Sequence, residues 1–161
     1  MPKSVTQLDG EVWKVILGWE NYSVSNLGRV KRNAHRTWNR GSSRYRPHWK
    51  FYPEKLMNTR MARNNANYPN GRYEYVPLSG PDGNDKNAMV HQLVLEAFVG
   101  PRPAKHEARH MDCDSSNNKL SNLKWGTSAE NKQDTITKYG EYKWKGKPAW
   151  MPYLRTFPMM A

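Results

Sequence analysis

A chain of 161 residues has room for one compact domain or for two small modules. Hydrophobic residues make up 37% of the chain and charged residues 25%, and no apolar run approaches the roughly 20 residues that cross a bilayer, so the composition excludes a membrane protein and a fully disordered chain. The formal net charge of +12 indicates a polyanionic partner, and the single cysteine, Cys113, excludes a disulfide framework or a multi-cysteine zinc knuckle within the chain.

Residues Glu11–Arg32 have the pattern of a small β element. Apolar and aromatic side chains fall among polar ones in short alternating runs, at Trp13, Val15, Tyr22, Val24 and Val30. The residues Ser25–Gly28 supply turn chemistry between two of these runs. The sequence therefore predicts a hairpin in this first segment.

The positive charge is concentrated in one part of the chain. Residues Arg29–Arg63 hold eleven Lys or Arg against a single acid, Glu54. Guanidinium groups pair with phosphates, and the aromatic rings interleaved with them would stack on exposed bases or pack against sugars. The alternative is a basic surface over a small aromatic core. The predicted nucleic-acid contacts in this region are Arg29, Lys31, Arg32, Arg36, Arg40, Arg44, Arg46, Arg60 and Arg63.

Within this basic region, Asn33–Arg46 is polar and nearly free of aliphatic residues. A segment of this composition buries too little apolar surface to fold alone. We therefore expect an exposed loop that becomes ordered only on a nucleic acid.

The next segment combines two strands with one helix. Arg72–Ser79 alternates as a strand does, with Pro77 favouring an edge position, and Lys86–Val90 follows a turn as a second strand. An apolar stripe then predicts a helix that ends at Gly100 and packs against the core, with Val90, Leu93, Val94, Ala97 and Phe98 on the stripe. His91 opens this helix, where a histidine is either a packed or capping residue or a neighbour of an active site.

Residues Ala108–Asp134 predict a strand, an irregular loop, a second strand and a helix. The first strand ends at His110, and a loop rich in Asp, Ser and Asn follows it. The second strand covers Leu123–Gly126. Thr127, with Glu130 three residues later, forms the capping-box pattern at the start of the helix.

His110 and Asn131 are the candidate active-site pair of this segment. Packing the four pieces together brings the end of the first strand next to the first turn of the helix. We therefore expect the imidazole and the carboxamide to face one another across a shallow cleft.

The segment resembles the ββα-metal motif, or His-Me finger, of the HNH endonucleases, in particular those of phages and homing introns. His110, Asn122 and Asn131 match the three signature positions, with Asn in place of His at the third. The preceding helix and residues Glu11–Arg32 are similar to segments that accompany this motif in the homing type. The resemblance implies an α+β fold with a ββα-metal nuclease core behind a small, β-rich, basic N-terminal module. We expect the module in residues 1–70, the nuclease domain in 71–140 and an aromatic and basic arm in 141–161.

The resemblance also implies a role for each matched residue in phosphodiester hydrolysis. His110 would be the general base, because an imidazole with a pKa near about 6.5 takes a proton from water at neutral pH. Asn131, with Asp112 as a further candidate ligand, would hold a divalent cation that prefers oxygen ligands, Mg²⁺ or alternatively Mn²⁺. Asn122 would tie the loop to the backbone and so hold the His110 ring in position.

Arg109 departs from the family pattern, which often has a metal-binding acid just before the general base. A cation cannot ligate a cation, so three alternatives are open. Another acid such as Asp112 supplies the ligand, Arg109 itself clamps the scissile phosphate as a DNA contact, or the site is weakened or inactive.

Together these observations predict a metal-dependent endonuclease of phage or mobile-element type that nicks or cuts double-stranded DNA. The rival is a nucleic-acid-binding protein that keeps the HNH fold without its activity. We expect the protein to be located in the cytoplasm, because residues 1–10 lack the apolar segment of a secretory signal. If a phage encodes the chain, this would be the cytoplasm of the host cell. Nothing in the sequence demands a dimer, so a monomer is expected to suffice.

Overall fold

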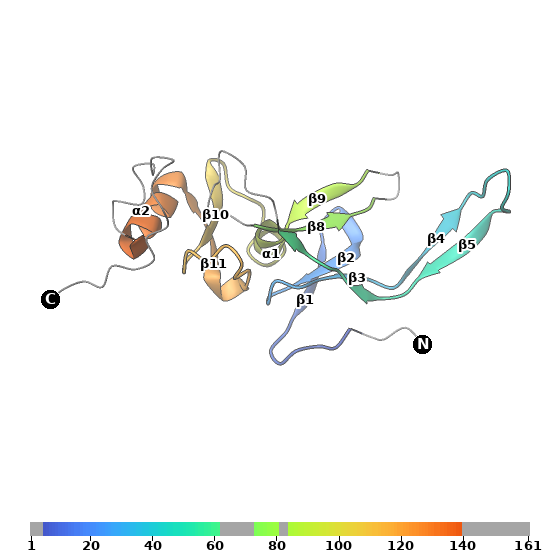
Figure 1. Ribbon diagram of the computed structural model, residues 1–161, viewed down its shortest axis with the longest axis horizontal. Helices are drawn as coiled ribbons and strands as arrows, with labels where there is room; N and C mark the ends of the chain where they lie inside the picture. The colour runs from blue at the N-terminus through green and yellow to red at the C-terminus, as the bar shows by residue number, and fades with distance from the viewer. Residues whose placement is uncertain (1–4, 62–72, 81–83, 140–161) are drawn as a thin grey trace, which may run out of the picture.

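The computed structural model describes residues 5–61, 73–80 and 84–139, which form four small β-sheets and two α-helices (Figure 1). Strands dominate the first half of the chain, and both helices lie in the second half. The predicted α+β class with a strand-rich N-terminal module is therefore confirmed. The predicted arm at 141–161 lies outside the described residues.

The N-terminal sheet has four antiparallel strands. The predicted hairpin is confirmed, since Val24 pairs with Val30 across a turn in which Gly28 adopts a φ of +80°. Alternate residues such as Tyr22 and Val24 point into the core and are buried. In spatial order the strands are β1 (Trp13–Ile16), β2 (Trp19–Ser25), β3 (Val30–Arg32) and β6 (Lys55–Leu56).

The prediction of a loop at 33–46 was wrong. Strand β4 (His35–Asn39) pairs in antiparallel register with β5 (His48–Tyr52), and the two form a ribbon that projects from the body (Figure 1). Cross-strand contacts between large side chains hold this ribbon in place of an aliphatic core. Trp38 lies opposite Trp49 with ring centroids 5.3 Å apart.

A three-stranded antiparallel sheet follows, in the order β7 (Arg60–Met61), β8 (Glu74–Leu78) and β9 (Lys86–Met89). Both predicted strands are therefore present, but β8 is the middle strand and not an edge. Pro77 is tolerated there because β7 pairs only with the first two residues of β8, so the missing N–H of Pro77 lies beyond the end of β7.

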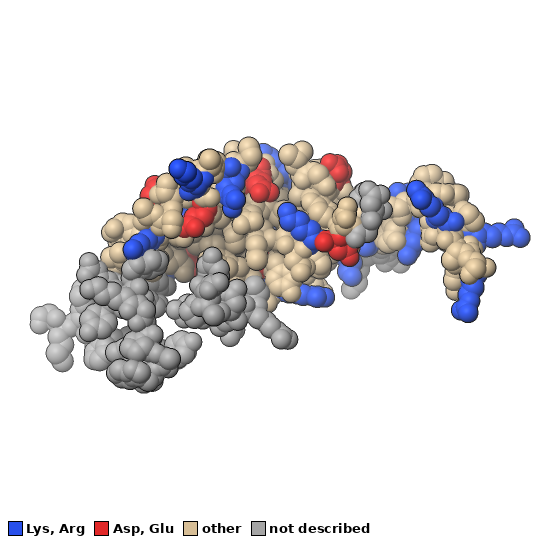
Figure 2. All heavy atoms as spheres, turned by 90° about the horizontal axis from the view of Figure 1, so that it is seen from above, with Lys and Arg blue, Asp and Glu red and all other residues tan. Residues whose placement is uncertain are grey.

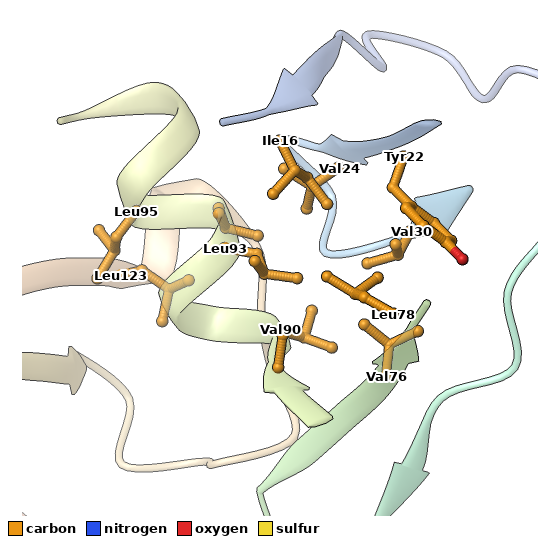
Figure 3. Packing of buried hydrophobic residues seen from close by; sticks show 12 residues of the cluster. Ile16, Tyr22, Val24, Val30, Val76, Leu78, Val90, Leu93, Leu95 and Leu123 are labelled. Atoms are coloured by element: carbon orange, nitrogen blue, oxygen red, sulfur yellow. The ribbon is translucent and has the colours of Figure 1, made fainter. Parts of the chain in front are cut away.

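Helix α1 (Val90–Phe98) is the centre of the hydrophobic core, as its apolar stripe predicted. The N-terminal sheet and β8 pack on one side of the helix, and Leu123, in the segment Ala108–Asp134, packs against it as well (Figure 3). Residues from both predicted modules thus contribute to one core. The division at residue 70 remains a prediction.

The predicted strand, loop, strand and helix are confirmed in the last part of the described chain. Strand β10 (His106–His110) pairs with β11 (Leu123–Thr127), and α2 (Ser128–Tyr139) follows directly. The capping box at the start of α2 is formed: the Thr127 amide donates to the Glu130 carboxylate at 2.7 Å, and the Glu130 amide donates to the Thr127 hydroxyl at 3.3 Å. Neither described helix has the length and apolarity that a membrane span requires.

Candidate active site

His110 ends strand β10 and turns its side chain toward helix α1. The ring is only 6% exposed, and it makes an edge contact with His91 at a centroid distance of 5.3 Å. Tyr73, just before β8, completes this aromatic cluster with its ring centroid 6.0 Å from His110. His91, predicted as a packed residue or a neighbour of the site, is thus both buried and in contact with the candidate base.

A short chain of hydrogen bonds fixes which nitrogen of His110 carries the proton. The Asn118 side chain donates from Nδ2 to Glu74 Oε2 at 3.2 Å, so its Oδ1 is the atom turned toward the imidazole. His110 Nε2 lies 3.3 Å from that oxygen and therefore donates to it. The lone pair of the neutral ring is left on Nδ1, which is the nitrogen able to take up a proton.

Burial keeps both histidines of the cluster neutral at physiological pH. Desolvation lowers the pKa of His110, while the hydrogen bond from its ring to Asn118 and the charges of Asp112 and Asp114 act in the opposite direction. Burial and then the charge of His110 lower the pKa of His91 to about 4. His91 Nδ1 has no hydrogen-bond partner among the described residues, which makes a charged state costlier still.

Asn122 forms hydrogen bonds with both the beginning and the middle of the loop that follows His110. Its Oδ1 accepts from the Asp112 amide at 3.0 Å, and its Nδ2 donates to Asp112 Oδ1 at 2.8 Å and to the Asn117 carbonyl at 2.9 Å. The Met111 amide also donates to the Asn122 carbonyl at 2.9 Å. This is the geometry that a loop-holding residue requires, whereas its part in catalysis remains a prediction.

The Asp112 carboxylate is already engaged inside the loop. Besides Asn122, it accepts from the Asp114 amide at 2.8 Å and from Asn117 Nδ2 at 2.6 Å. Desolvation raises the pKa of this group, but the hydrogen bonds from Asn117, Asp114 and Asn122 outweigh it and bring the pKa to about 2. Both oxygens thus support the turn, which is the competing use that Asp residues in such loops have.

The turn of the N-terminal sheet rests directly on this loop. A Cβ at Gly28 would lie 2.8 Å from Asn118 Cβ, so only glycine fits that approach at a φ of +80°. The Leu120 amide donates to the Asn26 carbonyl at 2.8 Å. The residue that orients His110 is therefore supported from the N-terminal half of the chain.

Arg109 faces the other side of β10, where helix α2 packs. Its Nε and Nη2 donate to Asp134 Oδ2 at 2.9 and 2.6 Å, and Nη1 lies 3.3 Å from Glu130 Oε1. The side chain is 10% exposed. The predicted contact of Arg109 with a phosphate remains a prediction, and it would require these ion pairs to open.

Asn131 lies on the same side as Arg109. Its Nδ2 donates to Glu107 Oε1 at 2.8 Å, and Glu107 and Arg109 alternate with Ala108 and His110 along β10. The contacts therefore do not bring His110 and Asn131 together as expected: strand alternation turns the imidazole toward α1 and leaves the carboxamide between β10 and α2.

The predicted nucleic-acid contacts of the basic region fall into two groups, with Arg63 outside the described residues. Three are engaged within the N-terminal module: Arg29 pairs with Glu11 at 3.4 Å, Lys31 pairs with Glu54 at 2.6 Å, and Arg32 donates to a backbone carbonyl. The others are exposed on the projecting ribbon, in its turn and on β7: Arg36, Arg40, Arg44, Arg46 and Arg60. Figure 2 shows Lys and Arg gathered at the end of the molecule where the ribbon projects.

Sequence reasoning missed the roles of several residues around His110 and Arg109. Asn118 and Glu74 orient the candidate base, and Glu130 and Asp134 bind Arg109. The only sequence signal was the spacing of the two α2 acids, four residues apart and so on one helix face. Glu74 lies 44 residues from Asn118, and no local pattern announces such a contact.

Two family models match the chain. Residues 88–133, from the end of β9 into α2, match the family described as HNH endonuclease. Residues 11–74, which include the N-terminal sheet and the β4–β5 ribbon, match the family described as NUMOD4 motif. The resemblance to the HNH endonuclease family, with an associated N-terminal module, is therefore confirmed.

Two known proteins support this assignment. A protein of Acanthamoeba polyphaga mimivirus described as an uncharacterized HNH endonuclease is 28% identical over 130 residues, or 78% of this chain, and the chain spans 26% of that relative's length. A solved structure reporting DNA binding and cleavage by the HNH homing endonuclease I-HmuI matches with a TM-score of 0.56 and 24% identity, covering 80% of this chain and 60% of that one. The second match shows that the fold is shared.

Proposed function

We propose that the chain is an endonuclease that hydrolyses phosphodiester bonds of double-stranded DNA, with His110 as its general base. The observation that carries the proposal is the state of this imidazole. It stands neutral at a strand end, anchored through Nε2 by Asn118, and its Nδ1 is left to accept a proton. The HNH match and the DNA-cleaving protein of the same fold support the same reaction.

In this reaction His110 Nδ1 takes a proton from the water that attacks phosphorus. The other ring nitrogen, Nε2, keeps its proton and donates it in the hydrogen bond to Asn118 Oδ1, while the Glu74 carboxylate accepts from the Asn118 amide and so holds its orientation. The bonds of Asn122 keep the following loop in place while the ring becomes charged. The described residues thus contribute a neutral imidazole that is held in a fixed orientation.

The fold family implies a divalent cation, Mg²⁺ or Mn²⁺, which would stabilise the charge of the phosphate. Among the described residues, no group of three or more His, Cys, Asp or Glu side chains is arranged to hold one. Asp112 is bound within its loop, and the carboxylates of Glu130 and Asp134 are paired with Arg109. These residues do not fit a carboxylate-held metal, and the amide oxygen of Asn131 is the remaining oxygen of the predicted set.

The exposed basic residues of the β4–β5 ribbon and β7 are proposed to bind the DNA backbone. Residues 33–53 contain five Lys or Arg and no acid, and Figure 2 shows Lys and Arg on the end of the molecule where the ribbon projects. Each phosphate contact releases counterions, and binding should therefore weaken steeply with salt. The viral relative suits an enzyme of viral or mobile-element origin that acts in the host cytoplasm.

A DNA-binding protein without nuclease activity is the second candidate. The observation that favours it is the pairing of Arg109 with both α2 acids, because a carboxylate held by a guanidinium is not free to bind a metal. Such a protein would keep the exposed basic ribbon and bind duplex DNA without cutting it.

Nicking of supercoiled plasmid with Mg²⁺ or Mn²⁺ separates the two candidates. The enzyme predicts nicking that is lost in His110→Ala while a gel-shift assay shows unchanged DNA binding. His106→Ala, four residues earlier on the same strand, is the matched control and should keep its activity. Folded wild-type protein that binds DNA but does not nick it in either metal would establish the binding protein instead.

A further inference from the structure

The guanidinium of Arg109 is enclosed by three elements of the HNH segment. It leaves β10, crosses over Gly126 of β11 and ends between Glu130 and Asp134 of α2. A Cβ at Gly126 would lie 2.2 Å from Arg109 Cδ and 2.6 Å from Nη1, so the arginine side chain uses the space that the missing side chain leaves. The seat is therefore built into the fold, and the contact is not an incidental surface pair.

The charges around this seat form an acidic group with one cation inside it. Asp134 accepts two hydrogen bonds from the guanidinium through one oxygen, and Glu130 contributes a second carboxylate. Glu107, two residues before Arg109 on β10, accepts a hydrogen bond from Asn131 of α2. Without Arg109, Glu130 and Asp134 of α2 would lose the guanidinium with which they pair.

We propose that Arg109 is the resident cation of this junction: its guanidinium takes the place of a divalent metal there and docks α2 onto the β10–β11 pair without one. A guanidinium within the chain pairs with two carboxylates in a fixed geometry. A divalent ion would need the oxygens of those same carboxylates as its ligands. The inference does not depend on nuclease activity, because it concerns ion binding and the docking of a helix.

The proposal predicts how Mn²⁺ binds to the full chain in the absence of DNA, measured by electron paramagnetic resonance. The wild type should show no site that depends on Asp134, so Asp134→Asn and wild type should bind Mn²⁺ alike. Arg109→Asp should bind Mn²⁺ at least about tenfold more tightly than wild type. The new Asp adds a carboxylate ligand, and the loss of the guanidinium frees the carboxylates of Glu130 and Asp134. Glu96→Gln, an exposed acid on α1, controls for general loss of charge.

Thermal unfolding gives a second readout. The melting temperature of the wild type should be the same in EDTA and in millimolar Mn²⁺, whereas Arg109→Ala should melt at a lower temperature and recover part of the loss in Mn²⁺. Tight Mn²⁺ binding by the wild type that disappears in Asp134→Asn would overturn the proposal. Should Arg109→Ala and Arg109→Asp both fail to fold, this wild-type comparison still decides the question.

Discussion

The described residues form two antiparallel two-stranded ribbons of equal strand length that differ in what packs against them. In the β10–β11 pair, α2 contacts both strands and α1 packs against them too, and the strand side chains are sorted between the two helices. In the β4–β5 pair, neither of the two described helices covers a face, and Trp38, Trp49 and Phe51 are between 51 and 64% exposed. The comparison teaches that packing decides how far a ribbon constrains its side chains: those of β10–β11 are held in fixed contacts, whereas many of those of β4–β5 are exposed.

Three aromatic rings of the bare ribbon, Trp38, Trp49 and Phe51, lie on one of its faces. Directly paired residues share a face, so Arg36 with Phe51 and Trp38 with Trp49 lie on the same side. A two-stranded hairpin is marginal on its own in water. We therefore expect this ribbon to open more readily than β10–β11, and the predictions below test the contrast.

The largest effect is expected at the packed ribbon. Replacing His110 by Ala removes the general base, and the nicking rate should fall by about 10²–10⁴-fold. In the wild type the rate should rise with pH through the lowered pKa of His110 and level off below neutrality, because only the neutral ring accepts a proton. Single-turnover nicking across pH measures both, and a rate that His110→Ala leaves unchanged would contradict the assignment.

Matched tryptophans on the two ribbons should differ in their effect on stability. Trp125 of β11 packs against the core and donates to the Gly100 carbonyl at 3.1 Å, so Trp125→Ala should lower the free energy of unfolding by about 3 kcal/mol. Trp38→Ala removes one exposed pair and should cost about 1 kcal/mol or less. Urea unfolding of both variants compares them, and equal losses would refute the contrast.

Acid should destabilise the packed half through His91. Its pKa is about 4 in the folded chain and about 6.5 when unfolded, so the unfolded state binds the proton first, and stability falls as the pH drops from about 6.5 to 4. The loss is of order 3 kcal/mol at most, since one pKa unit corresponds to about 1.4 kcal/mol. His91→Leu should flatten urea-unfolding free energies over this range, and an unchanged slope would show that His91 does not cause it.

The smallest effect on stability is expected for the arginines of the bare ribbon. Replacing Arg36, Arg40, Arg44 and Arg46 together by Gln should leave the unfolding free energy nearly unchanged, because all four are exposed. DNA affinity should fall, and the slope of log K against log salt should decrease by up to about 0.9 for each lost phosphate contact. The matched control replaces exposed Lys86, Arg102, Lys105 and Lys124, and an equal loss of affinity there would remove the ribbon's special role.

The same contrast explains what could be predicted from the sequence. Helix α1 and the ββα unit follow from apolar periodicity and a capping box, which are local patterns that burial then reinforces. The β4–β5 ribbon was missed because its strands are joined by aromatic pairs across a turn and not by an aliphatic core. The sequence of this ribbon therefore lacks the alternation of aliphatic and polar residues that marks a half-buried strand.

The finer structure of the candidate site depended on contacts between distant residues. The motif located His110, Asn122 and Asn131, but the direction of each side chain followed from strand alternation and from its partners. Arg109 finds its counter-ion 25 residues away on α2, and Asn118 finds Glu74 on another sheet. Such pairings are set by tertiary packing, which residue spacing does not encode.

The close contact between Gly28 and Asn118 has a consequence for the design of shorter fragments of this protein. A fragment that begins after the N-terminal sheet would lose the turn that contacts the loop following His110, together with the Asn26 carbonyl that accepts from the Leu120 amide. The imidazole of such a fragment would lose its alignment although every motif residue was retained. The N-terminal sheet and the loop that orients His110 are thus parts of one packed unit.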